Sequence, residues 1–233
     1  MKHILLLAAL LFALSGFAQK PAPASTDSAG DLEAVLSKMD KASANFKLAQ
    51  ASFQWDQYQK VVDETDVQKG QVYFRRNRNG IDAAFDITSP GAKNIVFKDG
   101  KIRIYEKKID QLTERDVSKN KSDVEAFMSL GFGGRGHDLP KSYEVKMGGW
   151  ETIDQVKTAR LELAPISPKV RNVLNRVVLW VDPERDISIK QQFFEPSGDY
   201  RLAHYTGIKL NSKLPDNVFT LKTTSNTKIV RPQ

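Results

Sequence analysis

The apolar positions of the chain repeat with a helical period near the amino end and with a strand period over most of the remainder. The first stretch spaces its apolar residues three or four positions apart: Leu32, Val35, Leu36, Met39, Ala42 and Phe46. This spacing predicts an amphipathic helix of about four turns that begins at Asp31. After Phe46 the period changes to two, and apolar and polar residues alternate from Ile81 to Thr88 until a Ser89-Pro90-Gly91 turn. The alternation predicts half-buried strands.

A β-hairpin is predicted between Asn94 and Tyr105, where Asp99-Gly100 separates two β-rich runs. Asp-Gly favours the type I′ turn, whose twist matches that of paired strands. Closing this two-residue turn pairs Lys98 with Lys101 and extends outwards along both strands. The register places four apolar side chains on one face: Ile95, Phe97, Ile102 and Ile104.

Strand-like runs continue towards the carboxyl end of the chain. They are Ser142–Met147, Gln155–Leu163, Val173–Val181, Asp186–Phe194, Tyr200–Leu210 and Val218–Leu221. Turn signals between them stand at Gly148-Gly149, Asp182-Pro183-Glu184 and Pro196-Ser197-Gly198-Asp199. Many strands joined by short turns predict an antiparallel meander.

A short helix interrupts the strands in the middle of the chain. Ser122-Asp123-Val124-Glu125 has the pattern of a capping box, apolar residues follow it, and Gly131 marks the end of the helix. No linker or repeat is visible after Gly30. We therefore expect residues 31–233 to form a single α+β domain, in which the long helix covers one face of a large, curved, mainly antiparallel sheet.

The amino end has the features of a secretory signal peptide. Met1-Lys2-His3 precedes an apolar run from Ile4 to Leu14, and Ser15-Gly16-Phe17-Ala18-Gln19 supplies a small-x-small cleavage site. The apolar run of about 11 residues is shorter than the roughly 20 that span a bilayer. We expect residues 1–18 to be removed by cleavage after Ala18 and residues 19–30, rich in Pro, Ala and Ser, to form a flexible lead-in.

Composition places the chain among soluble globular proteins, with 40% hydrophobic and 27% charged residues. Lys and Arg number 35 against 28 Asp and Glu, which gives a net charge of +7. The basic clusters Arg75-Arg76-Asn77-Arg78 and Lys107-Lys108 either face an anionic lipid or acidic partner, or form a solvated surface. Cysteine is absent. That absence excludes disulfides, thiolate zinc sites, a Cys nucleophile and the lipid anchor of a lipoprotein.

No motif indicates an enzyme. The segment Gly131–Gly136 matches G-x-G-x-x-G, but a helix precedes it and Pro140 follows, whereas a dinucleotide site needs a strand before it and a helix after it. We interpret it as a flexible loop. His137 and His204 stand in different segments without metal-ligand spacing, and neither Walker A nor G-x-S-x-G occurs. We expect no catalytic residue, metal, cofactor or nucleic-acid partner.

The order of these features resembles that of the LolA-type outer-membrane lipoprotein carriers. The resemblance covers most of residues 31–230 and rests on the signal peptide, the first helix and four motifs. The motifs are Ala51-Ser52-Phe53-Gln54, Gly70-Gln71-Val72-Tyr73-Phe74-Arg75-Arg76, Lys98-Asp99-Gly100-Lys101 followed by Tyr105, and Asp216-Asn217-Val218-Phe219-Thr220-Leu221. The resemblance implies an open, curved half-barrel of about ten or eleven strands, with helices as a lid over its concave apolar face.

In the LolA-type carriers an arginine just after the G-x-(apolar)-x-x stretch of the second motif holds the lid closed by hydrogen bonds. Counting from Gly70 gives Arg76, and Arg75 competes because Asn77 stands where the family usually has proline. The resemblance assigns the apolar face of the lid helix to Leu32, Val35, Leu36 and Met39. The candidate lining of an acyl-chain cavity, or alternatively ordinary core, is Val72, Phe74, Phe85, Ile87, Ile95, Phe97, Ile102 and Ile104.

The function implied by the resemblance is that of a soluble, monomeric periplasmic carrier without a lipid anchor. Such a carrier takes acylated lipoproteins from an inner-membrane ABC transporter to an outer-membrane receptor or to the outer membrane itself. An acyl chain needs an apolar container, because burying it is worth ~0.8 kcal/mol per CH₂. Two alternatives remain open: transport of another lipid, such as a glycolipid or polyprenyl lipid, and a sensing module that detects lipoproteins with the same cavity.

Overall fold

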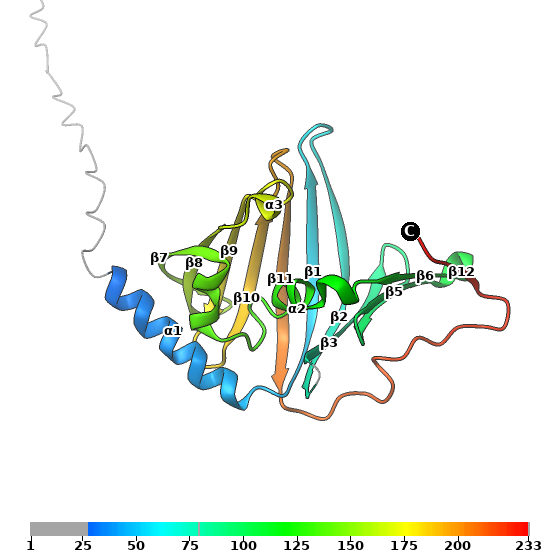
Figure 1. The fold of residues 1–233 in the computed structure, drawn as a ribbon, viewed down its shortest axis with the longest axis horizontal. Helices are drawn as coiled ribbons and strands as arrows, with labels where there is room; N and C mark the ends of the chain where they lie inside the picture. Colours follow the sequence, from blue (N-terminus) through cyan, green and yellow to red (C-terminus); the bar gives the residue numbers. More distant parts are fainter. Residues whose placement is uncertain (1–27, 79, 233) are drawn as a thin grey trace, which may run out of the picture.

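The computed structural model describes residues 28–78 and 80–232 (Figure 1). The predicted signal peptide lies outside the described residues, as does most of the predicted lead-in. Helix α1 (Ser28–Asn45) begins slightly earlier than the sequence pattern indicates, so residues 28–30 are helical. Within the described residues, no helix is long and apolar enough to cross a membrane.

The described chain is built around one open sheet of twelve strands. The strands are β1 (Leu48–Gln59), β2 (Glu64–Asn77), β3 (Gly80–Ser89), β4 (Lys93–Lys98), β5 (Lys101–Glu106), β6 (Gln111–Asp116), β7 (Tyr143–Ile153), β8 (Val156–Pro165), β9 (Arg176–Asp182), β10 (Ile187–Phe194), β11 (Tyr200–Leu210) and β12 (Lys228–Val230). Their order is β12-β6-β5-β4-β3-β2-β1-β11-β10-β9-β8-β7. Every neighbouring pair is antiparallel except β12 with β6. This confirms the predicted fold class, with β12 adding to the expected number of strands.

The helical elements are few and short apart from α1. They are α2 (Lys121–Met128), the single turn α3 (Pro168–Arg171) and the 3₁₀ turns η1 (Lys107–Ile109), η2 (Ser118–Asn120) and η3 (Gly136–Lys141). Figure 1 shows α1 along the β7–β9 side of the sheet and α2 in front of β11 and β1. We call the face that carries α1 and α2 the inner face, and the opposite face the outer face.

The predicted hairpin is confirmed by the pairing of β4 with β5. Lys98 pairs with Lys101, and the register continues to Ile95 opposite Ile104. Both turn residues have positive φ, 53° at Asp99 and 69° at Gly100. A type I′ turn requires these values, so the turn chemistry determined the register as expected.

Two strand predictions were wrong. Residues Val218–Leu221 form turns instead of a strand, because Phe219 packs down onto the outer face beside Ala84 and Val96. Gly148-Gly149 is a bulge within β7 and not a turn between strands, since the register with β8 shifts between Met147 and Trp150. Gly149 has a φ of 104° there, which lets the extra backbone fit without ending the strand.

The capping-box prediction for α2 was also wrong. The position before the helix is Asn120, and no side chain caps it. The turn η2 leads straight into α2, so Ser122 already lies inside the helix. The end of the helix agrees with the prediction, because the chain leaves α2 after Met128 and Gly131 has a φ of 78°.

Three apolar clusters hold the sheet and its covering segments together. A central cluster on the inner face spans β1–β4, β10 and β11, and a second cluster packs α1 against β8 and β9. The third lies on the outer face, under the segment that follows β11. Figure 1 shows this carboxyl-terminal segment running past β2 and β3 to reach β12 beside β6. Both faces of the middle of the sheet are therefore covered by the chain itself.

Candidate functional site

The central cluster of the inner face is dominated by aromatic rings. Strand alternation turns Phe53 of β1, Phe74 of β2 and Phe85 of β3 to the same side of the sheet. Trp55 lies 4.6 Å from Phe53 and 5.1 Å from Phe85 between ring centroids. These rings form a continuous apolar surface across neighbouring strands. Such a surface can bind either a helix or an apolar ligand.

The predicted cavity-lining residues lie in or beside this cluster, with one exception. Five of them are buried members: Val72, Phe74, Phe85, Ile87 and Phe97. Ile95 and Ile102 are partly buried and pack against it. Ile104 is only half-buried and is not part of the cluster. The sequence pattern therefore predicted correctly that most of these residues share one apolar face. Their contact with a ligand stays a prediction.

The predicted lid helix covers a different part of the sheet from the central cluster. Val35, Leu36 and Met39 of α1 are buried against β8 and β9, and Leu32 packs at the edge of the same cluster. The central cluster is covered instead by Phe46, just after α1, by α2 and by Phe132. The apolar spacing predicted the buried face of α1, but spacing carries no information about which strands that face meets.

The glycine segment Gly131–Gly136 is a packed part of this cover, which corrects its interpretation as a flexible loop. Phe132 is buried, stacks on Phe74 at 4.3 Å and meets Tyr205 edge-on at 4.8 Å. It forms an isolated β-bridge with Ile187. The backbone is tied to β10 on both sides, by Ser188 N donating to Gly131 O and by Gly133 N donating to Asp186 O. We call residues 131–136 the glycine plug.

Small residues are needed in the glycine plug because α1 and Phe46 lie against its backbone. A Cβ on Gly136 would stand 2.4 Å from the carbonyl oxygen of Leu36 in α1. A Cβ on Gly133 would stand 2.4 Å from the ring of Phe46, and Gly133 also has a φ of 74°. The glycines that imitate a nucleotide motif therefore allow helix, plug and sheet to pack closely.

Arg76, at the end of β2, joins the sheet to two segments on its inner face, α1 and the glycine plug. Its Nη1 donates to the carbonyl oxygen of Ser43 at 2.8 Å, and its Nη2 donates to the carbonyl oxygen of Gly133. The hydroxyl of Ser43 donates to the same Gly133 oxygen at 2.7 Å. Ser43 lies in the last turn of α1, where unsatisfied helix carbonyls favour a cation. The guanidinium thus connects the sheet, α1 and the glycine plug.

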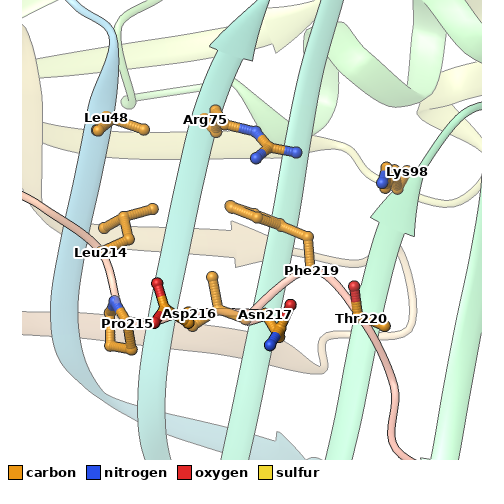
Figure 2. A pocket seen from close by; sticks show the side chains of 10 residues that line it. Leu48, Arg75, Lys98, Leu214, Pro215, Asp216, Asn217, Phe219 and Thr220 are labelled. Atoms are coloured by element: carbon orange, nitrogen blue, oxygen red, sulfur yellow. The ribbon is translucent and has the colours of Figure 1, made fainter.

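Arg75, the competing arginine, lies on the outer face. Its Nη2 is 2.5 Å from the buried carboxylate of Asp82, and its guanidinium lies 4.4 Å above the ring of Phe219. Figure 2 shows Arg75 and Phe219 facing each other in a pocket of about 350 Å³ beneath the carboxyl-terminal segment. The two adjacent arginines alternate across β2. Of the pair, Arg75 therefore attaches the carboxyl-terminal segment, and Arg76 reaches the cover of the inner face.

Asp186 is a buried carboxyl group directly beneath the glycine plug. Its exposed fraction is 0%, and neither carboxylate oxygen has a hydrogen-bond partner among the described residues. Burial raises the pKa of Asp186 to about 8, Arg76 acts in the opposite direction, and Asp40 raises it further. The sequence analysis did not single out this residue, because an aspartate at the start of a strand-like run is ordinarily exposed.

His137 fastens α1 to η3 by charge-assisted contacts. Its Nδ1 lies 2.8 Å from Asp40 and its Nε2 lies 3.2 Å from Glu33, both on α1. The hydrogen bond with Asp40 raises the pKa of His137. His204 lies elsewhere, 2.6 Å from Asp154 in the turn between β7 and β8. Within the described part of the chain no three His, Cys, Asp or Glu side chains gather as a metal site would require.

The tryptophans take separate places. Trp55 packs against the central cluster, whereas Trp180 donates to Glu151 at 2.7 Å on another part of the sheet. Trp150 is exposed, with the ammonium of Lys157 over its ring at 4.7 Å. Of the three, Trp55 is the one placed to contact a ligand on the inner face. The exposed Lys107 and Lys108 stand in η1, far along the sheet from the cover.

Comparisons with known proteins bear on the fold. No protein-family profile and no curated protein matches the chain. An uncharacterized conserved protein from Thermus thermophilus aligns over 87% of this chain and 99% of its own, with 11% identity and a TM-score of 0.55. The lipoprotein LppX of Mycobacterium tuberculosis aligns over 80% and 98%, with 11% identity and a TM-score of 0.52.

MucB aligns over 86% of this chain and 66% of its own length, with 12% identity and a TM-score of 0.52. A LolA superfamily protein from Nitrosomonas europaea aligns over 82% and 97%, with 18% identity and a TM-score of 0.40. The chain shares its fold with the Thermus thermophilus protein, MucB and LppX. At these identities the likeness concerns the fold alone.

The close approach of the glycine plug to α1 is tested by Gly136→Ala. The added Cβ meets the Leu36 backbone, so we expect the free energy of unfolding to fall by roughly 1–3 kcal/mol. Gly91→Ala is the matched control, because nothing lies within 4 Å of its Cβ position. Urea denaturation measures both variants. Equal stability of the two would show that plug and helix are not packed as described.

The buried Asp186 predicts a pH-dependent stability difference. Its folded pKa of about 8 lies above its ordinary 3.8, so the folded state binds more protons between these values and loses stability as pH rises through that window. Asp186→Asn removes this titration. We expect its free energy of unfolding, relative to the unsubstituted protein, to increase from pH 5 to pH 8 by a few kcal/mol. A pH-independent difference in urea denaturation would contradict the burial of a titrating carboxyl.

Proposed function

We propose that this protein is a periplasmic carrier that holds the acyl chains of lipoproteins against the central cluster of the inner face. One observation carries the proposal. The central apolar surface of the sheet is covered by a separate plug, and the guanidinium of Arg76 ties this plug to both the sheet and α1. Opening such a cover breaks its bridge to β10 but leaves the pairing between the strands of the sheet in place.

The central cluster has the chemistry that an acyl chain requires. Its buried members are aromatic or aliphatic and come from six neighbouring strands, together with Phe46 and Phe132. Each CH₂ that enters gains ~0.8 kcal/mol, so a multiply acylated lipoprotein easily compensates for the contacts it displaces. Displacing Phe132 exchanges one apolar contact for another. The structure thus supports a closed, unloaded form in which Phe132 takes the place of the ligand.

The cover is held by polar contacts as well as by the burial of Phe46 and Phe132. Arg76 donates to the carbonyl groups of Ser43 and Gly133, and hydrogen bonds from a charged group contribute about 1.5–3 kcal/mol each. A ligand that binds only the open form must replace the apolar contacts and overcome these hydrogen bonds. Opening is therefore accessible to a strongly apolar cargo and not to water-soluble molecules.

The sequence resemblance supports the same function. The motifs from Ala51 to Leu221 resemble those of carriers that bind lipoproteins. The partners that follow are acylated lipoproteins, an inner-membrane ABC transporter for loading, and an outer-membrane receptor or the membrane for release. Because the sequence has no nucleotide motif, the transporter has to supply the energy of loading.

A sensing module is the second candidate. The structure of a Pseudomonas aeruginosa MucA/MucB complex aligns with 82% of this chain and 61% of that chain, with 12% identity and a TM-score of 0.50. The same fold therefore occurs in a protein that binds a protein partner. Lipid binding that changes affinity for a regulator, without delivery of lipoproteins to outer membranes, would favour this function.

Native mass spectrometry of the protein purified from the periplasm tests the proposal. We expect part of the preparation to carry triacylated protein, and lipid extraction to recover its acyl chains. A co-purifying glycolipid or polyprenyl lipid would favour transport of another lipid. A chain that is empty and also binds no fluorescent fatty acid would contradict lipid carriage altogether.

Arg76→Leu tests the role of the cover. The variant loses both hydrogen bonds to the cover, so the closed form is less populated and a fluorescent fatty acid should bind about tenfold more tightly. The carrier should also release its cargo less readily to outer membranes. Arg75→Leu is the matched control, because Arg75 makes its contacts on the outer face. This substitution should lower the free energy of unfolding without changing the affinity for the fatty acid. Unchanged affinity of a folded Arg76→Leu would contradict the proposed latch.

A further inference from the structure

The connection between β8 and β9 exposes an unusual number of aliphatic side chains. Within residues 166–176, which we call the α3 loop, the exposed fractions are 44% at Ile166, 37% at Val170 and 67% at Val173. Leu174 is buried in the cluster beneath α1 and anchors the loop. Single exposed aliphatic residues are common, but three within eight positions form a patch that calls for a partner.

The α3 loop is also basic. It contains Lys169, Arg171 and Arg176 and no acidic residue. Arg171 donates to the carbonyl oxygen of Ile166 at 2.7 Å, and the guanidinium of Arg176 lies 4.0 Å from the ring centroid of Phe194. Both contacts hold the arginine stems against the protein, and all three basic residues remain exposed. Positive and aliphatic groups therefore alternate on one short, ordered loop.

The α3 loop belongs to the end of the sheet opposite Arg76. Asn175 N donates to Phe194 O at 2.9 Å, which joins the loop to the turn between β10 and β11. The backbone N of Lys60, in the turn between β1 and β2, donates to Asp199 of that same turn at 2.8 Å. Figure 1 shows these three connections at one edge of the molecule, away from the carboxyl end of α1. The loop can therefore meet a large surface without touching the cover.

We propose that the α3 loop docks the protein on a bilayer that contains anionic lipids. Its aliphatic side chains enter between the headgroups, while Lys169 and the two arginines lie against lipid phosphates. Val61, 94% exposed at the tip of the neighbouring turn, adds a second apolar contact. Asp63 and Glu64 follow it, so the electrostatic attraction comes from the α3 loop and not from this tip.

A bilayer fits this surface better than a folded protein does. A stable protein interface buries about 800 Å² on each partner, with a central hydrophobic pocket or anchor residue. The α3 loop is a narrow projection without an aromatic side chain of its own, and its charge has a single sign. These properties suit an extended, negatively charged and fluid partner. The inference rests on the proposed function and extends it by placing one end of the sheet on the membrane that receives or supplies cargo.

Flotation with lipid vesicles tests the docking surface. The full mature chain is mixed with vesicles of phosphatidylcholine alone or of phosphatidylcholine with phosphatidylglycerol, at low and high salt. We expect binding only to the anionic vesicles, weakened by salt. Lys169→Gln with Arg171→Gln should reduce it at least about tenfold, because each basic residue near such a surface contributes about fivefold. Val170→Ser with Val173→Ser should reduce it similarly.

The matched control is Lys228→Gln with Ile229→Ser on β12. Ile229 is 51% exposed and stands beside a lysine, like the residues of the α3 loop, but lies at the far edge of the sheet. The control should bind anionic vesicles like the unsubstituted protein. Absence of vesicle binding, equal binding to neutral vesicles, or full binding by both α3-loop variants would overturn the proposal.

Binding of a fluorescent fatty acid in solution separates this inference from the proposed function. The α3-loop variants should bind the fatty acid with unchanged affinity, since none of the substituted residues belongs to the central cluster. Loss of vesicle binding with retained fatty-acid binding in these variants supports the docking surface. A protein that binds vesicles through the loop but binds no fatty acid would leave the docking surface standing and refute the carrier.

Discussion

The guanidinium of Arg76 donates hydrogen bonds to two backbone carbonyl groups, those of Ser43 and Gly133. One carbonyl belongs to the last turn of α1 and the other to the glycine plug. Each also accepts from a second donor, Phe46 N at 3.1 Å for Ser43 and the Ser43 hydroxyl at 2.7 Å for Gly133. Arg76 is thus the side chain through which β2 holds both segments on the inner face, and both carbonyl groups keep a partner when it lets go.

The position of the arginine follows from the pleat of β2. Arg75 and Arg76 are adjacent, so one must point to each face. On the outer face Arg75 meets Asp82 and Phe219 and holds the carboxyl-terminal segment. On the inner face Arg76 meets the cover. One short sequence thus secures both sides of the sheet. Arg76 also lowers the pKa of the buried Asp186, against the effect of burial.

Local patterns predicted what local physics determines. The Asp99-Gly100 turn predicted the hairpin register, and apolar spacing predicted the buried face of α1, because both depend on a few neighbouring residues. The motif from Gly70 to Arg76 left the choice of arginine open, because the sequence alone does not say which face of β2 each arginine takes. Phe132 and Asp186 were missed because their burial depends on β10 meeting a glycine-rich segment far earlier in the chain. The apolar residues of Val218–Leu221 resemble those of a strand. They are apolar because Phe219 packs on the outer face of the sheet, and no strand pairing is involved.

The central claim is that an acyl chain displaces the glycine plug from the inner face. Hydrogen exchange of the backbone amides, measured with and without a bound fatty acid, tests it directly. The amides of Gly133 and Ser188, which donate to Asp186 and Gly131, are protected in the closed form. The account predicts that both exchange faster when the fatty acid binds, while the amides of β4 and β5 keep their protection. Unchanged protection of Gly133 and Ser188 in the loaded protein would contradict it.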